Sequence, residues 1–294
     1  MSIFFTLTMV TVAISISAMD AITRQIIRLA YFEDVKTGDI TSALTIPKKL
    51  QGRAVILAKS DGILAGAEAT AYAFKLAAAS IRVKFHVRDG QKFAAGRKIV
   101  TVQGPMRGLL KGERIALNLL ARLSGIATFT ARFVAIAGEY GVQILDTRKT
   151  TPGLRVLEKS AVLQGGGRNH RMGLYDMVLI KDNHIAAAGG VAAALSRVAD
   201  YRRQVEIEIS DFSQLQEALE YKPDIIMLDN FDRQAIRRAV KLIRSKRPKT
   251  KVELSGGINL LNIGSFARTG VDFISVGALT HSAPAADFSM KYLK

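Results

Sequence analysis

Residues 205–257 read VEIEISDFSQLQEALEYKPDIIMLDNFDRQAIRRAVKLIRSKRPKTKVELSGG, and their rhythm points to a fold class. Three short apolar runs, VEIEI, DIIML and KVEL, alternate with two segments, FSQLQEALE and RQAIRRAVKLI, whose apolar residues recur at helical spacing. Strands that alternate with helices in this way are typical of a parallel sheet with helical crossovers. The stretch therefore predicts repeated β–α units.

The same rhythm continues on both sides of this stretch. The runs VQIL and MVLI precede it and DFISV follows it, which gives six or seven units. Because a full barrel of this kind has eight units, we predict an incomplete α/β barrel of about seven strands over residues 131–294. A doubly wound open sheet is the alternative, and it is less favoured because no GxGxxG follows a first strand.

Residues 20–130 have a different, mixed pattern. GRAVILAKS, IRVKFHV and KIVTVQG read as strands, and EATAYAFKLAAA reads as a helix. We expect TGDIT, at residues 37–41, to be a loop, and the apolar run at residues 108–138 to form two helices that meet at Gly125. This half of the chain is therefore predicted to be an α/β sandwich domain, with the C-terminal tail packing back on it.

The composition narrows the class of protein. The chain has 294 residues with 49% hydrophobic residues, enough for a well-buried core. It has no cysteine, so disulfides and thiolate metal sites are excluded. Its net charge of +17 attracts anions, but only 7% of the residues are aromatic and no nucleic-acid recognition motif is present. The composition favours phosphorylated or acidic small molecules over nucleic acid as the main partner.

The first 19 residues form an apolar extension without charge. By length they are a marginal membrane span, but Ser and Thr dilute the apolar run and no basic segment precedes it. We favour an upstream start ahead of the true opening helix, MDAITRQIIRLAYFED, over an ordered or anchoring extension. No membrane association is expected, and the predicted location is cytoplasmic.

Polar residues and glycines occupy the ends of the predicted parallel strands. They are Asp146 to Lys149, Lys181, Glu208, Asp229, Ser255, Gly256, Gly257 and Gly277. In α/β barrels the active site is built at the carboxyl ends of the strands, so these residues predict one shared site.

The same residues suggest two ligands, a phosphate group and a metal ion. The small residues in SGGI and SVGALTHS follow the last two strands, where barrels often bind a phosphate through backbone N–H groups. Glu208 and Asp229 are acids among cations, and carboxylates beside a phosphate suit Mg²⁺. Each acid could instead balance a nearby lysine, and Glu206 faces the same way as Glu208 and could replace it.

A third group of residues surrounds a run of three glycines. The stretch from residue 145 to residue 185 reads LDTRKTTPGLRVLEKSAVLQGGGRNHRMGLYDMVLIKDNHI. Cations recur along it, and glycine lets a backbone approach a ligand closely. This concentration of cations predicts an anionic ligand. The cationic side chains are Arg148, Lys149, Arg168, His170, Arg171, Lys181 and His184.

These motifs together resemble the signature of the quinolinate phosphoribosyltransferase family. The resemblance continues in GERIALNLLARLSGIAT, IMLDN, SGGI and ISVGALTHSAPAADFS, and it covers the chain from about residue 20 to its end. It implies an N-terminal α/β sandwich packed against an incomplete α/β barrel. The implied reaction joins quinolinate to phosphoribosyl pyrophosphate with Mg²⁺, giving nicotinate mononucleotide, CO₂ and pyrophosphate in NAD biosynthesis.

The resemblance also implies roles for individual residues. Quinolinate would be bound by Arg148, His170, Arg171 and Lys181, with Arg114 donated by the neighbouring subunit of a homodimer. Lys149 and Lys181 would act in catalysis together with Glu208 and Asp229, the two acids near the ribose and the metal. Phosphate groups would lie against Ser255, Gly256, Gly257 and Gly277.

Several charged residues receive a structural interpretation instead. Arg155, Lys159 and Arg168 are expected to be charges on a helix face or at the rim, and His86 and His281 are expected to be structural. The chain departs from the family pattern in EDVKTGDIT, where Lys36 replaces a glycine that is common there. This departure concerns only the local conformation of a loop remote from the barrel motifs.

Three other functions remain as alternatives. The molybdenum-operon paralogue has the same fold, but the intact NHR and IKDNHI favour a substrate with two carboxylates. A nicotinate-specific enzyme would need fewer cations. A basic nucleic-acid-binding protein that has lost catalysis is less favoured because no catalytic residue is missing.

Overall fold

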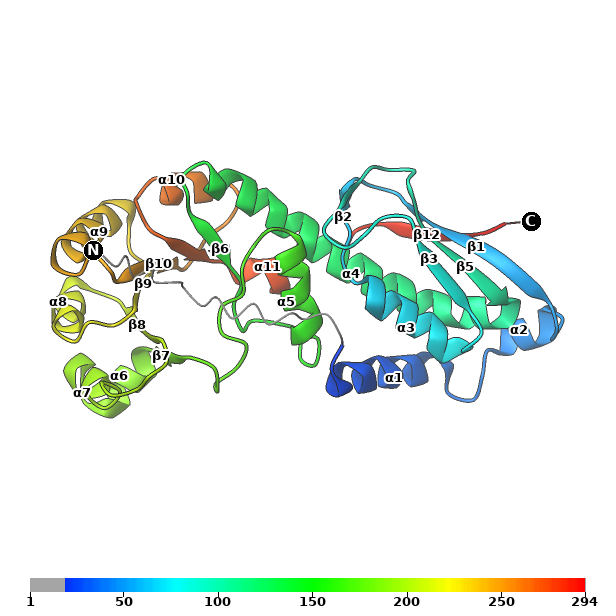
Figure 1. Ribbon diagram of the computed structural model, residues 1–294, viewed down its shortest axis with the longest axis horizontal. Coiled ribbons are helices and arrows are strands. Elements are labelled where there is room, and N and C mark those ends of the chain that lie inside the picture. The colour runs from blue at the N-terminus through cyan, green and yellow to red at the C-terminus, as the bar shows by residue number, and fades with distance from the viewer. Residues whose placement is uncertain (1–18, 294) are drawn as a thin grey trace, which may run out of the picture.

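The structure is a computed structural model and describes residues 19–293 (Figure 1). Residues 1–18, nearly all of the apolar extension, lie outside the described residues. An antiparallel sheet occupies one end of an elongated molecule and a parallel sheet the other. One long helix, α4 (Met106–Gly138), runs between them and joins the two halves.

The first half contains three helices besides α4 and most of the antiparallel strands. Their bounds are α1 Ala21–Val35, α2 Ile40–Thr45, β1 Gln51–Ala58, β2 Gly62–Ile63, α3 Ala67–Ala77, β3 Arg82–Phe85, β4 Lys92–Phe93 and β5 Lys98–Pro105.

The main antiparallel sheet has the strand order β12-β1-β5-β3. Its edge strand β12 (Phe288–Leu293) is the C-terminal segment, which returns to pair with β1, with Ala58 opposite Phe288. Helices α3 and α4 pack against each other and bury Phe74 and Leu109 completely. The expected strands and the helix of this half are confirmed.

The segment predicted as a loop at residues 37–41 instead leads into a short helix. Asp39 accepts a hydrogen bond from the backbone N–H of Ser42 at 3.0 Å, so it caps α2, which begins at Ile40. An aspartate followed by three residues that can enter a helix is an N-cap signal. The loop prediction was wrong for the last two residues of that segment.

The prediction of two helices meeting at Gly125 was also wrong, because α4 is continuous for 33 residues. A Cβ atom at Gly125 would fall against the carbonyl oxygen of Pro284 and 3.0 Å from Cα of Ala285. The glycine is therefore explained by the close approach of another backbone rather than by a break in the helix. Because α4 also continues through residue 130, the domain division expected there stays a prediction.

By length and composition α4 could cross a membrane, with a mean hydropathy of 1.4 over its most apolar window. Here it is a core helix that contacts α3, the strand β5 and later elements of the second half, and 44% of that window is buried.

The second half alternates strands and helices as predicted. Its elements are β6 Gln143–Leu145, α5 Arg155–Gln164, β7 Val178–Ile180, α6 Asp182–Ala188, α7 Val191–Ser196, β8 Val205–Ile209, α8 Phe212–Glu220, β9 Ile225–Asp229, α9 Arg233–Lys246, β10 Lys251–Ser255, α10 Ile263–Ala267, β11 Phe273–Ser275 and α11 Ala278–His281.

The strands of this half form one parallel sheet in the order β6-β11-β10-β9-β8-β7. The first strand pairs with the last, with Ser275 opposite Leu145, which is barrel topology rather than the reversed order of a doubly wound sheet. The sheet stays open between β6 and β7, and a single bridge from Arg168 to Leu145 extends its edge. The predicted incomplete α/β barrel is confirmed, with six strands and this one bridge.

Candidate active site

Parallel pairing brings the carboxyl ends of the strands to one edge of the sheet. Ser255 at the end of β10 lies opposite Asp229 at the end of β9. Lys181 follows β7, and its neighbour Ile180 pairs with Ile207 of β8. Lys181, Glu208, Asp229, Ser255 and Gly277 thus come from five successive strands of the sheet, as the sequence predicted.

Lys181 and the two predicted metal-binding acids form the centre of this edge. The ammonium group of Lys181 forms an ion pair with a carboxylate oxygen of Glu208. Burial, and then the charge of Glu208, raise the pKa of Asp229, while Lys181 and a 2.8 Å hydrogen bond from Asn230 oppose this rise. Two neighbouring carboxylates at strand ends supply the oxygen ligands that Mg²⁺ prefers. The donor set therefore fits a magnesium ion.

Arg148 and Arg171 contribute two adjacent guanidinium groups. The Nε atom of each is buried and has no hydrogen-bond partner among the described residues. Burial, and then the nearby charge of Arg148, lower the pKa of Arg171. Arg171 is only 9% exposed, and its Nη1 donates to the carbonyl of Met177 at 3.4 Å. Two neighbouring guanidinium groups, each with a buried Nε donor that is unused, are suited to a planar anion with carboxylates.

His170 faces two acids inside the barrel. Its Nε2 lies 3.0 Å from a carboxylate oxygen of Glu206 and 3.7 Å from one of Glu253. Both acids are fully buried, and all four of their oxygens lack a hydrogen-bond partner within residues 19–293. Burial raises the pKa of Glu206 to about 8 and that of Glu253 to about 8, and it lowers the pKa of His170.

These three side chains could offer ligand atoms within 4.8 Å of one another to a metal ion. However, the backbone N–H of Arg171 donates to Nδ1 of His170 at 2.7 Å. A neutral imidazole that accepts at Nδ1 carries its proton on Nε2, so Nε2 has no lone pair for a metal. We therefore interpret the cluster as a set of contacts within the protein rather than as a metal site.

Lys159 is not the exposed charge that the sequence suggested. It is fully buried and forms an ion pair with Asp146, which is also fully buried. Burial raises the pKa of Asp146 and lowers that of Lys159. The sequence of the helix alone does not distinguish an exposed lysine from a buried one. The burial of Lys159 depends on Asp146, which follows a different element, the strand β6.

Asp146 and Lys159 form hydrogen bonds with residues of the segment 169–171. The side-chain amide of Asn169 donates to Asp146 at 2.6 Å, and the backbone N–H of His170 donates to Asp146 at 2.9 Å. Lys159 donates to the carbonyl of His170 at 3.0 Å. The chain on either side of His170 is therefore rigidly placed.

The predicted phosphate loops have the backbone freedom that such loops need. Gly256 and Gly257 adopt φ values of 100° and 61°, which favour glycine. A Cβ atom at Gly256 would collide with the side chain of Asn230, whereas one at Gly257 would meet open space. A Cβ atom at Gly277 would lie 3.0 Å from Cδ of Lys149, so this loop and Lys149 are neighbours.

The remaining charged residues named from the sequence have the following surroundings. Arg114 is exposed on α4 and has no hydrogen bond or ion pair with the described residues. Arg168 is exposed, and Arg155 donates to Thr150 and to the carbonyl of Met172. His86 contacts Thr101 at 2.7 Å on the antiparallel sheet, and His281 contacts Ser282 at 2.6 Å.

Sequence reasoning missed Glu253 and Glu158. Glu253 could have been noticed because it lies two positions before Ser255 in a strand and so points to the same face. Glu158 is fully buried and accepts from Arg122 at 2.8 Å and from Thr151. Nothing in the sequence pairs α4 with α5, so this second contact could not be found.

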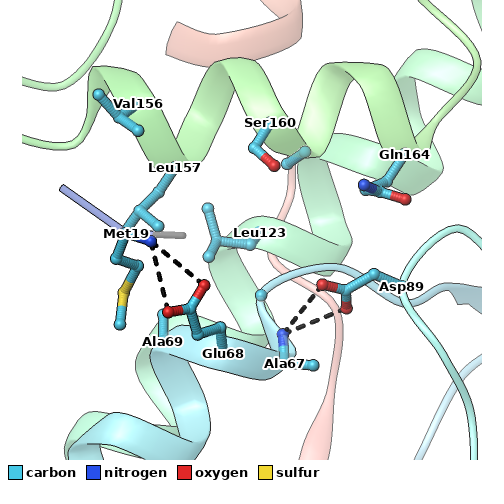
Figure 2. Close-up of a pocket in the computed structure, with 12 residues that line it drawn as sticks. Met19, Ala67, Glu68, Ala69, Asp89, Leu123, Val156, Leu157, Ser160 and Gln164 are labelled. Atoms are coloured by element: carbon cyan, nitrogen blue, oxygen red, sulfur yellow. Dashed lines mark hydrogen bonds between the residues drawn. The ribbon is translucent and has the colours of Figure 1, made fainter. Parts of the chain in front are cut away.

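A separate pocket lies between α3 and α5 (Figure 2). There the backbone N–H of Met19 donates to both oxygens of Glu68, at 3.3 and 3.2 Å, and that of Ala67 donates to Asp89. None of the predicted site residues lines this pocket, so we place the candidate active site at the strand ends instead.

Comparison with known proteins agrees with this geometry. Residues 39–124 match the family model of the quinolinate phosphoribosyl transferase N-terminal domain, and residues 126–291 match that of the C-terminal domain. A probable nicotinate-nucleotide pyrophosphorylase [carboxylating] from Bacillus subtilis is 44% identical over 263 residues, covering 88% of this chain and 90% of its own.

A quinolinate phosphoribosyltransferase [decarboxylating] from Nicotiana glauca, named as mitochondrial, is 42% identical and covers 91% of this chain and 81% of its own. The solved structure of a nicotinate-nucleotide pyrophosphorylase from Francisella tularensis superposes with a TM-score of 0.89 and 38% identity. The match covers 95% of this chain and 99% of that one.

Proposed function

The chain belongs to the quinolinate phosphoribosyltransferase family, and from this we propose that it is a carboxylating nicotinate-nucleotide pyrophosphorylase. It transfers the phosphoribosyl group of phosphoribosyl pyrophosphate to quinolinate, releases CO₂ and pyrophosphate, and yields nicotinate mononucleotide for NAD biosynthesis. The observation that carries the substrate assignment is the pair of buried Nε atoms of Arg148 and Arg171, which have no partner among the described residues.

Quinolinate is a planar dianion, and its recognition follows from these donors. Arg148 and Arg171 each present a fork that can bond a carboxylate at two points. Lys181 adds a point charge at the end of β7, beside Glu208. A monocarboxylate would leave part of this positive charge unpaired in a partly buried site, so the arrangement favours quinolinate over nicotinate.

The glycosyl step breaks the bond between ribose C1 and pyrophosphate and forms a bond from C1 to the ring nitrogen. Positive charge develops on C1, and the carboxylates of Glu208 and Asp229 are suited to stabilise it. Lys149, next to the loop at Gly277, is placed to bind the departing phosphate groups. Mg²⁺ held by Glu208 and Asp229 would stabilise the negative charge on pyrophosphate.

The decarboxylation step uses the charge that the first step creates. Once the ring nitrogen is a pyridinium, the electron pair left at C2 by the departing CO₂ lies next to a positive charge, and C2 then takes a proton. The fixed cations of the site hold the second carboxylate in place without reorganising, which is where preorganised electrostatics act.

The ribose phosphate is proposed to lie against Ser255, Gly256, Gly257 and Gly277. The positive φ values of Gly256 and Gly257 support this, because loops with such a backbone can present successive N–H groups to an anion. Gly257 also has open space where a side chain would stand.

We propose that the active form is at least a homodimer in which Arg114 reaches the neighbouring site. Arg114 is exposed without a partner in the described part of the chain, which supports a role between subunits. Helices α1 and α2 also expose Ile22, Phe32 and Leu44, at 69%, 63% and 82%. Large apolar side chains exposed on these two helices support a contact with a second copy of the chain. The predicted cytoplasmic location, without nucleic acid or membrane as partner, remains a proposal.

Calorimetric titration tests the substrate assignment. Wild-type protein should bind quinolinate more tightly than nicotinate. Arg171→Ala should weaken quinolinate binding roughly a hundredfold or more while leaving phosphoribosyl pyrophosphate binding largely intact. Arg168→Ala, which removes an exposed arginine, is the matched control. Unchanged quinolinate affinity in Arg171→Ala would remove Arg171 from its role.

A further inference from the structure

We propose that Arg122 and Thr280 are positioning residues that hold Lys149 against the loop at Gly277. They act through Lys149, whose ammonium group they place where it can meet the phosphate groups of phosphoribosyl pyrophosphate. This inference rests on the proposed function and deepens it, because that function assigns the binding of those phosphate groups to Lys149.

Lys149 lies in a loop, and side chains of other residues hold its backbone. The loop joins β6, which ends at Leu145, to α5, which begins at Arg155. The backbone N–H of Lys149 donates to Oγ1 of Thr147 at 3.0 Å, and its carbonyl accepts from the hydroxyl of Thr280 at 2.8 Å. Lys149 is exposed, so its backbone is held while its side chain stays accessible to a ligand.

Thr280 joins this loop to the loop that follows β11. It is fully buried, and its hydroxyl lies 3.2 Å from the carbonyl of Gly277 as well as 2.8 Å from that of Lys149. A Cβ atom at Gly277 would lie 3.0 Å from Cδ of Lys149, so the lysine side chain passes close to this glycine. One buried hydroxyl therefore links the two loops that are proposed to bind phosphate groups.

Arg122 of α4 contacts the same segment after β11. Its Nη2 donates to the carbonyl of Thr280, and its Nη1 donates to that of Ala283 at 3.3 Å. On its other side, Nε and Nη2 donate to the carboxylate of Glu158 at 3.1 and 2.8 Å. One guanidinium group thus joins α5 to the segment 280–283.

Glu158 holds the loop on the far side of Lys149. Its fully buried carboxylate accepts from the backbone N–H of Thr151 at 3.0 Å and from the Thr151 hydroxyl at 2.8 Å. A buried carboxylate is costly without a cation, and Arg122 supplies one. The loop is tied at both Lys149 and Thr151, and Arg122 contacts the residue that holds each.

This arrangement predicts a selective defect. Without the tie, Lys149 is free to move away from Gly277, and phosphoribosyl pyrophosphate should bind more weakly. Quinolinate binding should change little, because the tie is made to the carbonyl of Lys149, on the side of that residue away from Arg148.

The test is calorimetric titration with phosphoribosyl pyrophosphate and Mg²⁺. Thr280→Val keeps the branched shape but lacks the hydroxyl, and it should weaken binding roughly three- to tenfold, the effect of one lost hydrogen bond. Thr280→Ser keeps the hydroxyl and should bind nearly as the wild type does. Arg122→Lys keeps a charge beside Glu158 but loses the fork that also reaches Thr280, so it should weaken binding as well.

A double-variant cycle with Lys149→Ala distinguishes positioning from other effects. Lys149→Ala should itself weaken the binding of phosphoribosyl pyrophosphate. Adding Thr280→Val should then cause no further loss, because no ammonium group remains to be placed. Additive losses would overturn the proposal, since they would mean that Thr280 acts independently of Lys149. Wild-type affinity in Thr280→Val, or an equal loss of quinolinate binding in that variant, would also overturn it.

The same titrations separate this inference from the proposed function. If Lys149→Ala binds phosphoribosyl pyrophosphate as the wild type does, the proposed role of Lys149 fails and the inference fails with it. If Lys149→Ala loses affinity and Thr280→Val does not, only the positioning role fails.

Discussion

At the scale of single residues, the barrel interior contains several fully buried ionisable side chains besides those of the strand-end site. Asp146 and Lys159 are fully buried as a pair, and Glu206 and Glu253 are fully buried beside His170. Such groups are costly unless every one of them is compensated. Asp146 and Lys159 hold the segment 169–171, which carries Arg171, by hydrogen bonds to Asn169 and His170.

The buried ion pair gives a stability prediction. Lys159→Met should destabilise the protein by roughly 3–5 kcal/mol, because it leaves Asp146 buried without its cation. Urea unfolding of the purified protein measures this directly. Lys246→Met is the matched control: Lys246 lies on the surface, 3.8 Å from the exposed Glu220, and its loss should cost roughly 0–1 kcal/mol. Equal urea midpoints of unfolding for the two variants would contradict the conclusion that Lys159 and Asp146 form a buried ion pair.

Glu253 gives a prediction about pH. Its pKa is raised from 4.5 to about 8, so in this interval the folded protein binds more protons than the unfolded chain. Stability therefore falls as pH rises from about 4.5 to about 8. Glu253→Gln should make this decline shallower in urea unfolding series, whereas the exposed control Glu220→Gln should leave it unchanged. A slope that is the same in wild type and Glu253→Gln would show that Glu253 does not hold its proton.

The candidate site shows which residues could be predicted from sequence. Lys181, Glu208 and Asp229 were found because they follow apolar runs and the carboxyl ends of parallel strands must meet. Glu253 and Lys159 were missed because their roles depend on partners from other elements. Sequence periodicity indicates which face of its helix or strand a residue lies on. It does not indicate which charged residue of another element packs against that face.

At the scale of elements, the continuity of α4 is the main difference from the sequence-based expectation. The helical pattern was correct on both sides of Gly125, but the glycine was interpreted as a break. Its actual reason is the backbone of residues 284–286, which comes from the far end of the chain. Short elements such as α2 were similarly missed because a six-residue helix has too few positions for a periodic signal.

This explanation of Gly125 can be tested. In an ordinary helix, Gly→Ala stabilises by up to about 1 kcal/mol. Gly125→Ala should instead destabilise by about 1–3 kcal/mol, because its methyl group would meet backbone atoms that cannot move aside cheaply. Gly138→Ala, at the end of the same helix, has open space at this position and should be neutral or slightly stabilising. Urea unfolding distinguishes them, and stabilisation by Gly125→Ala would contradict the close approach.

At the scale of the whole molecule, the two halves are tied together by α4 and by the return of β12 to the first sheet. The exposed Arg114 lies near the start of α4, where the neighbouring Gly112 approaches Phe74 of α3, and so in the half of the chain that does not carry the strand-end site. The proposed site shared across a two-fold interface would account for this placement and for the exposed apolar side chains of α1 and α2.

Subunit complementation tests the shared site. Arg114→Ala and Arg171→Ala should each be nearly inactive alone. A mixture of equal amounts, dissociated and reassembled, should recover about one quarter of wild-type activity, because half of the dimers then contain one intact site of two. Dilution-dependent activity of the wild type provides an independent check. No recovery from fully exchanged dimers would mean that Arg114 acts within its own subunit or not at all.

The central claim is the reaction itself, and turnover assayed separately with two alternative acids tests it most directly. Purified protein is supplied with phosphoribosyl pyrophosphate and Mg²⁺, together with quinolinate in one reaction and nicotinate in the other. We predict nicotinate mononucleotide and CO₂ from quinolinate and no product from nicotinate. Turnover of nicotinate alone, or of neither acid, would contradict the assignment of Arg148, Arg171 and Lys181 to a dicarboxylate.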